Sequence, residues 1–287
     1  MHIMHYSTGK ERTVIVTEPR PVQDATIPVR AETAHAATAL RCSVVIPAYN
    51  EAARLTVTLD AAWSFLKHRG NDFELILVDD GSIDDTAPIA RKFAAQHANV
   101  SVITIRHAGK AAAVRTGLEA ASGDVVGFSD ADLATPLDYL DPFLALIGDG
   151  ADVVIGSREG VGSRRIGEPL YRHAMGRVFN RMVQIVVLPG IEDTQCGFKV
   201  FRREAARDIL ARSLLYRDSQ PVTGPRVTAF DVELLAIART LGMRIDSVPV
   251  IWTYGTNSKV NPVRDTLHNA IDIFRVRANL SLGRYRP

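Results

Sequence analysis

The chain has 287 residues, of which 46% are hydrophobic and 23% charged, with a formal net charge of +2. This balance excludes the disordered and fibrous classes for most of the chain. A net charge so close to zero gives no reason to expect a nucleic-acid partner. The length is sufficient for one large hydrophobic core or two small ones.

The sequence contains no uninterrupted apolar stretch of about 18 residues, and its first residues lack the pattern of a signal peptide. Cys42 and Cys196 are the two cysteines, and so few favour buried, reduced thiols over a disulfide scaffold. We therefore expect a cytoplasmic protein. Residues 1–40 mix acidic and basic side chains with scattered prolines, which predicts a flexible N-terminal arm.

From residue 41 onward, short Val- and Ile-rich runs alternate with longer amphipathic stretches, as in successive βα units. Strands are predicted at 42–46, 73–78, 100–105, 124–128 and 152–156. Further along, a helix is predicted at 171–187, a short strand at 200–201, a helix at 230–241 and an extended segment at 245–252. The predicted fold class is α/β: a doubly wound, Rossmann-like, mainly parallel sheet with helices on both faces. Residues 214–228 are predicted to form a long mobile loop.

The first two predicted strands end in polar groups, where open α/β sheets bind ligands. Tyr49, Asn50 and Glu51 follow the first strand and are placed to grip a base or a ribose, although Asn50 is equally suited to cap the next helix. Asp79 and Asp80 follow the second strand. Their carboxylates can accept hydrogen bonds from ribose hydroxyls or an imide N–H, while the alternative role is turn formation before the next helix.

Gly109 and Lys110 open the helix that follows the third strand. A lysine at a helix N-terminus opposes the helix dipole, so this position favours a bound anion nearby. The alternative is an exposed lysine without a role. A nucleotide-binding P-loop is excluded because the segment lacks its glycine pattern.

Asp130 and Asp132 stand at the end of the fourth predicted strand, two residues apart. Carboxylates in this arrangement can hold Mg²⁺ or Mn²⁺, and the metal would bridge the phosphates of a nucleoside diphosphate. The alternative is capping of the helix after Thr135 and Pro136.

Two segments are locally basic: 158–181 holds six arginines against two glutamates, and 259–286 holds six basic residues against two aspartates. We interpret the first as a source of phosphate clamps, with a solvated helix face as the alternative. In the second, Val263, Leu267, Ala270, Ile271, Phe274 and Ala278 recur at helical spacing among arginines. This predicts a basic amphipathic helix and tail at 263–287, which either docks on a membrane or packs against the domain.

Taken together, the segments SVVIPAYNE, LILVDDGS, GK, FSDADLATP, VIGSR, DTQCGFKVF, FDVELL, VPVIW and NSK resemble the family-2 glycosyltransferases of GT-A fold. The similarity is to the polyprenyl- and dolichyl-phosphate sugar synthases, and DTQCGFKVF with FDVELL is most similar to the dolichyl-phosphate glucosyltransferase branch. The resemblance implies a GT-A domain over 41–262. It also implies transfer of a sugar, expected to be glucose from a UDP-linked donor, to a polyprenyl or dolichyl phosphate with inversion and with Mg²⁺ or Mn²⁺.

The resemblance also assigns roles to individual positions. It implies contacts to the nucleotide sugar from Pro47, Ala48, Tyr49, Glu51, Asp79, Asp80, Lys110, Asp130, Ala131 and Lys259. It implies that Asp130 and Asp132 hold the metal, with Asp132 the stronger ligand, and that the catalytic groups are Asp130, Asp132, Arg158 and Arg172. Two departures are visible. Ala134 stands where mannosyl-type members often have a glutamine, and residues 107–111 read HAGKA where the family string around Lys110 has an Asn and a second Gly.

A phosphate acceptor would need no catalytic base, because its second pKa is about 6 and it is already dianionic near neutral pH. If the acceptor is instead a hydroxyl of a polysaccharide or secondary metabolite, Asp193 is the candidate base. A non-catalytic nucleotide-sugar binding module is a further alternative. For the lipid acceptor, we expect a peripheral protein at the inner face of the membrane, acting alone or with a separate membrane protein.

Overall fold

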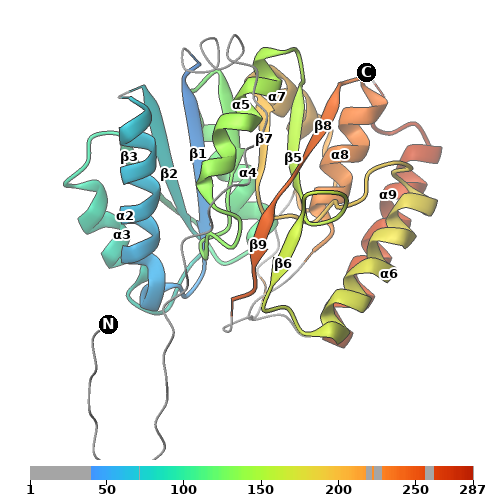
Figure 1. Ribbon diagram of the computed structural model, residues 1–287, viewed down its shortest axis with the longest axis horizontal. Coiled ribbons are helices and arrows are strands. Elements are labelled where there is room, and N and C mark those ends of the chain that lie inside the picture. The colour runs from blue at the N-terminus through green and yellow to red at the C-terminus, as the bar shows by residue number, and fades with distance from the viewer. Residues whose placement is uncertain (1–39, 71, 218–221, 223–227, 256–261, 287) are drawn as a thin grey trace, which may run out of the picture.

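The computed structural model describes residues 40–70, 72–217, 222, 228–255 and 262–286, the last range with side chains from His268 onward. In this part of the chain, a central sheet of seven strands has the order β3-β2-β1-β4-β7-β5-β8 (Figure 1). Its strands are β1 (Cys42–Ala48), β2 (Phe73–Asp79), β3 (Val100–Thr104), β4 (Val125–Phe128), β5 (Val153–Ser157), β7 (Lys199–Arg202) and β8 (Ile245–Pro249).

Every neighbouring pair in this sheet is parallel except those made by β7, which runs antiparallel to both β4 and β5. The strands are Val- and Ile-rich because both faces of the sheet are covered. A second, two-stranded sheet pairs β6 (Arg164–Ile166) with β9 (Ile251–Thr253). Since β9 follows β8 closely in the chain, this small sheet lies beyond the carboxyl ends of β5 and β8.

Helices cover both faces of the central sheet (Figure 1). One face carries α2 (Ala52–Arg69), α3 (Thr86–Ala94) and α5 (Leu140–Gly148), which a 3-10 turn at Leu137–Tyr139 precedes. The other face carries α4 (Lys110–Ala120), α7 (Arg203–Arg212) and α8 (Phe230–Thr240). Two further helices, α6 (Leu170–Val186) and α9 (Pro262–Ser281), lie side by side at the β8 end of the molecule.

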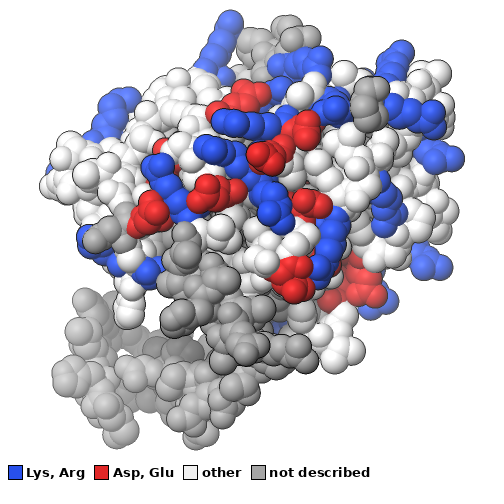
Figure 2. Space-filling view, turned by 90° about the horizontal axis from the view of Figure 1, so that it is seen from above, with Lys and Arg blue, Asp and Glu red and all other residues white. Residues whose placement is uncertain are grey.

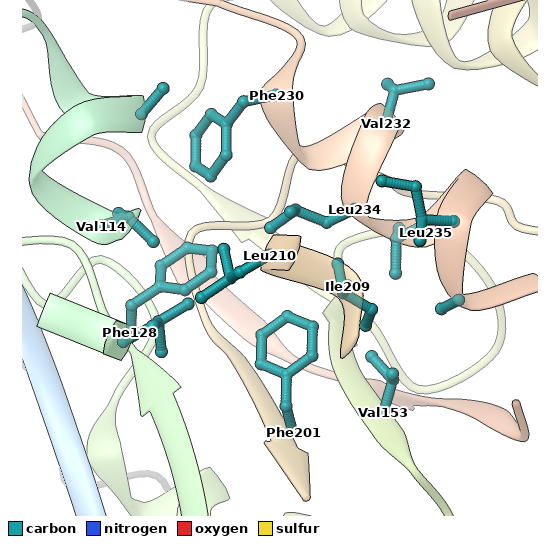
Figure 3. Close-up of a cluster of buried hydrophobic side chains, with 14 of the residues drawn as sticks. Val114, Phe128, Val153, Phe201, Ile209, Leu210, Phe230, Val232, Leu234 and Leu235 are labelled. Carbon is teal, nitrogen blue, oxygen red and sulfur yellow. The ribbon is translucent and has the colours of Figure 1, made fainter. Parts of the chain in front are cut away.

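Each face of the sheet has its own hydrophobic core. On the α4–α7–α8 side, Phe128 of β4 packs between Phe201 of β7 and Phe230 of α8, with ring centres 6.5 and 6.0 Å apart (Figure 3). Leu234 and Leu210 close the same cluster. The core therefore lies directly behind β4, the strand that precedes Asp130 and Asp132.

The predicted fold class is confirmed, and the five predicted strands of the first half agree with the structure to within one or two residues. The predicted helix at 171–187 is α6, and the extended segment at 245–252 is divided between β8 and β9 of different sheets. The sequence did not predict β6, because Arg164 and Arg165 carry no strand signal. The predicted N-terminal arm at 1–40 lies outside the described residues except for Leu40, as does most of the predicted loop at 214–228.

The C-terminal helix joins the core on one side through Ile273 and Val276, and Tyr285 beyond it is fully buried. The Tyr285 hydroxyl donates to the buried Glu233 of α8 at 2.8 Å. Glu233 also accepts hydrogen bonds from Ser213 Oγ and from the backbone N–H groups of Leu214 and Leu215, at 2.9 Å each. This network ties the end of the chain to the segment that follows α7. Separately, none of the helices in the described residues is both long and apolar enough to cross a membrane.

Candidate active site

The candidate site lies at the edge of the sheet where β1, β2, β4, β5 and β8 end. Because β7 is antiparallel, its first residue is at this same edge. The topology therefore brings together Tyr49 after β1, Asp80 after β2, Asp130 after β4, Arg158 after β5 and Gly197 just before β7. All of these positions except Gly197 were predicted from the sequence as candidate site residues.

The turn before α4 is built around Asp80. Its carboxylate is almost fully buried and accepts hydrogen bonds from His107 Nδ1 at 2.8 Å, Ala108 N at 2.8 Å and Gly109 N at 2.9 Å. The His107 ring in turn stacks flat on Tyr49, with ring centres 3.8 Å apart and planes 3° apart. Asp80 thus orients the turn that presents Lys110, and a direct contact from Asp80 to a nucleotide stays a prediction.

The residues after β1 are held against the loop that follows β2. Asn50 has φ 53°, and its side-chain oxygen accepts from Ile83 N at 2.9 Å, while Asn50 N donates to Ser82 Oγ at 2.9 Å. Asp79 Oδ1 accepts from Ser82 N at 3.1 Å, so it forms the turn that was its alternative role. Asn50 does not cap α2, because Glu51 occupies that position without a side-chain cap. Hydrogen bonds of the chain itself therefore hold the two loops together.

Lys110 and Asp130 form an ion pair across the site. Burial lowers the pKa of Lys110, but the combined attraction of Asp130, Asp231 and Asp132 outweighs burial and the pKa is raised overall. The lysine ammonium also lies 5.9 Å from the centre of the Phe128 ring. Lys110 is therefore not an exposed, indifferent side chain: it holds a positive charge beside Asp130 at the N-terminus of α4.

Gly197 makes room for the Asp130 carboxylate. A Cβ at this position would lie 2.0 Å from Asp130 Oδ2 and 2.4 Å from its Cγ, which is closer than real contacts allow. Glycine is required here because of this close approach. The structure thereby gives the segment before β7 a direct role in placing Asp130, which the sequence did not predict.

We expect Gly197→Ala to lower kcat/KM by about tenfold, because the added methyl must push Asp130 away from Lys110. Steady-state assay of nucleoside diphosphate release measures the effect. Gly176→Ala is the matched control, since a Cβ at Gly176 meets nothing within 4 Å and the residue lies in a helix. Equal activity of the two variants would show that Asp130 need not keep this position.

Asp132 lies at the open side of the site. Its Oδ1 accepts from Ala134 N at 3.1 Å, and a Cβ on Gly255, after β9, would lie 3.6 Å from its Oδ2. Removal from water by the surrounding protein, followed by the negative charge of Asp130, raises the pKa of Asp132. Helix capping does not explain either aspartate, because α5 begins several residues later with Tyr139 at its cap.

The two aspartates fit a divalent cation. In the described residues, no cluster of three or more His, Cys, Asp or Glu side chains is arranged to hold a metal by itself. Mg²⁺ and Mn²⁺ at phosphate sites are commonly bound by only one or two carboxylates, with phosphates and water completing the shell. Asp132 is the better placed of the pair, because Asp130 already binds Lys110. The raised pKa of Asp132 indicates that the protein does not fully balance its negative charge, and a bound cation would do so.

Arg158 and Asp193 form a bidentate, largely buried ion pair. Arg158 Nε and Nη2 donate to the two carboxylate oxygens at 2.7 and 2.9 Å, and the backbone N–H of Arg158 donates at 2.9 Å. Burial alone would raise the pKa of Asp193, but Arg158 outweighs it and holds the pKa far below the usual range. Asp193 is therefore unsuited to act as a base. Asp193 already balances the positive charge of Arg158. The role of Arg158 as a phosphate clamp stays a prediction.

The other arginines of the basic stretch are divided between structure and surface. Arg165 is buried between Glu159 and Glu168, with contacts of 2.8 and 2.9 Å. Arg172, in the first turn of α6, lies 5.3 Å from the ring centre of Tyr254, and Arg158 lies 5.4 Å from that of Trp252. A solvated helix face, the alternative, describes Arg177 and Arg181, which are exposed on α6, but not Arg158, Arg165 or Arg172. The aromatic residues of and after β9 instead hold Arg158 and Arg172, which the sequence did not predict.

The remaining predicted contacts are at the end of β1, after β4, before α2 and at Lys259. Pro47 and Ala48 are buried at the end of β1, in register with Val78 and Asp79. Ala131 is buried, and its carbonyl accepts from Thr58 at 2.6 Å. Glu51 pairs with Arg54 at 2.8 Å. Lys259 lies outside the described residues, so its predicted role is not placed.

Residues 43–210 match the family described as Glycosyl transferase family 2. The chain is 32% identical to dolichyl-phosphate beta-glucosyltransferase ALG5C of Trichomonas vaginalis, over 93% of this chain and 79% of that protein. It is 33% identical to the human dolichyl-phosphate beta-glucosyltransferase, over 85% of this chain and 77% of that protein. Glucosyl-3-phosphoglycerate synthase of Mycobacterium tuberculosis, solved with UDP, has the same fold with a TM-score of 0.59 at 23% identity, covering 91% and 87% of the two chains. This chain belongs to glycosyl transferase family 2 and is a glycosyltransferase.

Proposed function

We propose that this protein transfers glucose, with inversion, from UDP-glucose to a polyprenyl or dolichyl phosphate in a reaction that requires Mg²⁺ or Mn²⁺. The relatives that cover most of the chain at 32 to 34% identity are named dolichyl-phosphate beta-glucosyltransferases, which supports glucose and a lipid phosphate. The strand-end carboxylates and Lys110 support a nucleoside-diphosphate donor. The contacts predicted for Tyr49, Glu51 and Asp79 belong to the same proposal.

The observation that carries the choice of acceptor is the state of Asp193. A hydroxyl acceptor needs a base to remove its proton, whereas a phosphate monoester attacks the sugar as an anion. Asp193 was the candidate base, but it is fully buried, bound to Arg158 and has a strongly lowered pKa. The site therefore favours an acceptor that brings its own negative charge.

In this proposal the donor diphosphate and the acceptor phosphate meet in one site, and the residues at its edge can balance their negative charges. Two unit charges about 4 Å apart repel by roughly 4 kcal/mol at an effective dielectric near 20. Lys110, at the N-terminus of α4, faces Asp130 on the donor side, and Arg172 lies beside Tyr254 on the side of β9 and α6. When bound by Asp132 and Asp130, the divalent metal would neutralise charge on the departing diphosphate.

The proposed acceptor also implies that the protein acts at a membrane. A lipid phosphate lies in a bilayer, so the protein must act at its surface. We place it peripherally at the cytoplasmic face of the membrane, alone or with a separate membrane protein.

The test is a donor and acceptor screen with the purified protein. UDP-glucose, MnCl₂ or MgCl₂ and a short-chain, water-soluble polyprenyl phosphate should yield UDP and a lipid-extractable glucose product that mild acid hydrolyses. The product should be lost with EDTA and restored by excess metal. Turnover of a hydroxyl acceptor together with failure on every polyprenyl phosphate would overturn the proposal.

A further inference from the structure

Helix α6 exposes an apolar stripe that the rest of the described chain leaves uncovered. Its core side is formed by Phe179, Asn180 and Val183. On the opposite side, the exposed fractions are 58% for Tyr171, 37% for Met175, 71% for Val178 and 70% for Ile185. These positions recur at helical spacing on one outward side, and Met182, which falls between Val178 and Ile185, is the partly buried member that packs against the core.

Helix α9, which lies beside α6, repeats this arrangement. Asp272, Ile273 and Val276 face the core, whereas Ile271 is 41% and Phe274 60% exposed. Ala270, Ile271, Phe274 and Ala278 belong to the apolar face predicted from the sequence. Ile271, Phe274 and Ala278 are exposed and Ala270 is partly exposed, so the part of this face from His268 onward does not pack into the domain. We call the residues Tyr171, Met175, Val178, Ile185, Ile271 and Phe274 the α6–α9 face.

The charges around the α6–α9 face are basic. Exposed arginines flank it at positions 177, 181 and 277. Helix α6 contains no acidic residue, and Asp272, the one acid of α9 from His268 onward, is 2% exposed. Figure 2 shows mixed charges across the middle of the molecule and mostly basic side chains along the edge on the α6–α9 side. A second copy of the same face would bring like charges together, so self-association is disfavoured.

We propose that the α6–α9 face docks onto an anionic lipid bilayer, an inference that rests on the proposed lipid-phosphate acceptor. Apolar side chains flanked by arginines are the pattern of helices that lie in a membrane surface, where the arginines meet acidic headgroups. The bilayer is thus the one occupant that suits both the apolar stripe and the charge.

The position of α6 connects this docking surface to the active site. Tyr171 of the stripe is adjacent to Arg172, which lies against Tyr254. Tyr254 N donates to Ile166 O at 2.8 Å, and the next residue, Gly255, approaches Asp132. A bilayer on the α6–α9 face would therefore place a lipid phosphate next to Arg172. This is the side of the site away from the loops that follow β1 and β2.

The test is flotation of the protein with vesicles of phosphatidylcholine alone or with phosphatidylglycerol added. We expect binding to the anionic vesicles that weakens with added salt, and little binding to phosphatidylcholine alone. Val178→Glu and Phe274→Glu should each lower binding at least tenfold. Val57→Glu is the matched control, because Val57 is a helical valine of equal exposure, 73%, on α2 at the other end of the sheet.

Unchanged binding of either α6–α9 variant, or an equal loss with Val57→Glu, would overturn the docking surface. Binding of the wild type to neither kind of vesicle would also overturn it. Transfer to the water-soluble acceptor, measured in parallel, does not depend on a bilayer and should be unchanged in all three variants. If the wild type fails on that acceptor, the proposed function fails; if it succeeds without binding vesicles, the docking surface alone fails.

Discussion

Asp132→Ala is expected to reduce glucosyl transfer on the order of a thousandfold while leaving the fold intact. The variant removes the carboxylate best placed to hold the metal, and so removes the charge balance of the departing diphosphate. Asp132 lies at the open side of the site and has one hydrogen bond to Ala134 N, so little stability depends on it. Release of UDP and formation of labelled lipid measure the loss, and thermal unfolding checks the fold.

Asp138→Ala is the control for this experiment. Asp138 is an exposed aspartate six positions further along, in the 3-10 turn before α5. Its removal should leave transfer within about twofold of the wild type. Near-normal turnover of Asp132→Ala would remove the metal assignment, and loss of turnover in both variants would indicate damage to the segment between β4 and α5.

Asp193→Ala should destabilise the protein by about 3 kcal/mol, because it leaves the largely buried Arg158 guanidinium without its partner. Urea unfolding followed by tryptophan fluorescence measures the change, and Trp252, which lies against Arg158, is a local reporter. Asp208→Ala is the control: it removes a partly exposed pair with Arg212 within α7 and should cost about 0.5 kcal/mol or less. A loss this small for Asp193→Ala would mean that Arg158 finds water or another acceptor.

The same pair predicts a pH dependence. Burial raises the pKa of Asp193, but Arg158 lowers it by more, so the folded pKa lies below the unfolded value of about 3.9. For a lowered pKa, the stabilisation is complete above the unfolded pKa and is lost as pH falls below about 4. Urea midpoints of the wild type and Asp193→Ala should therefore converge in acid and differ most at neutral pH. A constant difference down to pH 2 would contradict the ion-pair origin of the stabilisation.

The parts of the fold that were predictable are those with a local signal. Residues 42–157 alternate apolar strands with amphipathic helices, and each strand end carries a polar motif, so both the strands and their shared edge follow from the sequence. Strand β6 was not predictable, because its arginines favour no element and it exists only through pairing with β9. That pairing depends on where β5 and β8 end in space.

For the site, residue types were easier to predict than roles. Asp80, Lys110, Asp130 and Arg158 all reach the same edge, but their partners come from segments far away in the sequence. Asp193, 35 residues beyond Arg158, neutralises it, and Gly197 gives space to Asp130. Such contacts have no local signal because they arise only when β7 enters the sheet between β4 and β5.

The late position of β7 in the chain also bears on biosynthesis. In the finished sheet, β5 hydrogen-bonds only to β7 and β8, although the ribosome makes β5 before either of them. A nascent chain that has just emerged with β1 to β5 can pair the first four strands but has no place for the fifth. Until β7 has emerged from the ribosome, β5 presents two unpaired edges, and unpaired strand edges make a nascent polypeptide prone to aggregation.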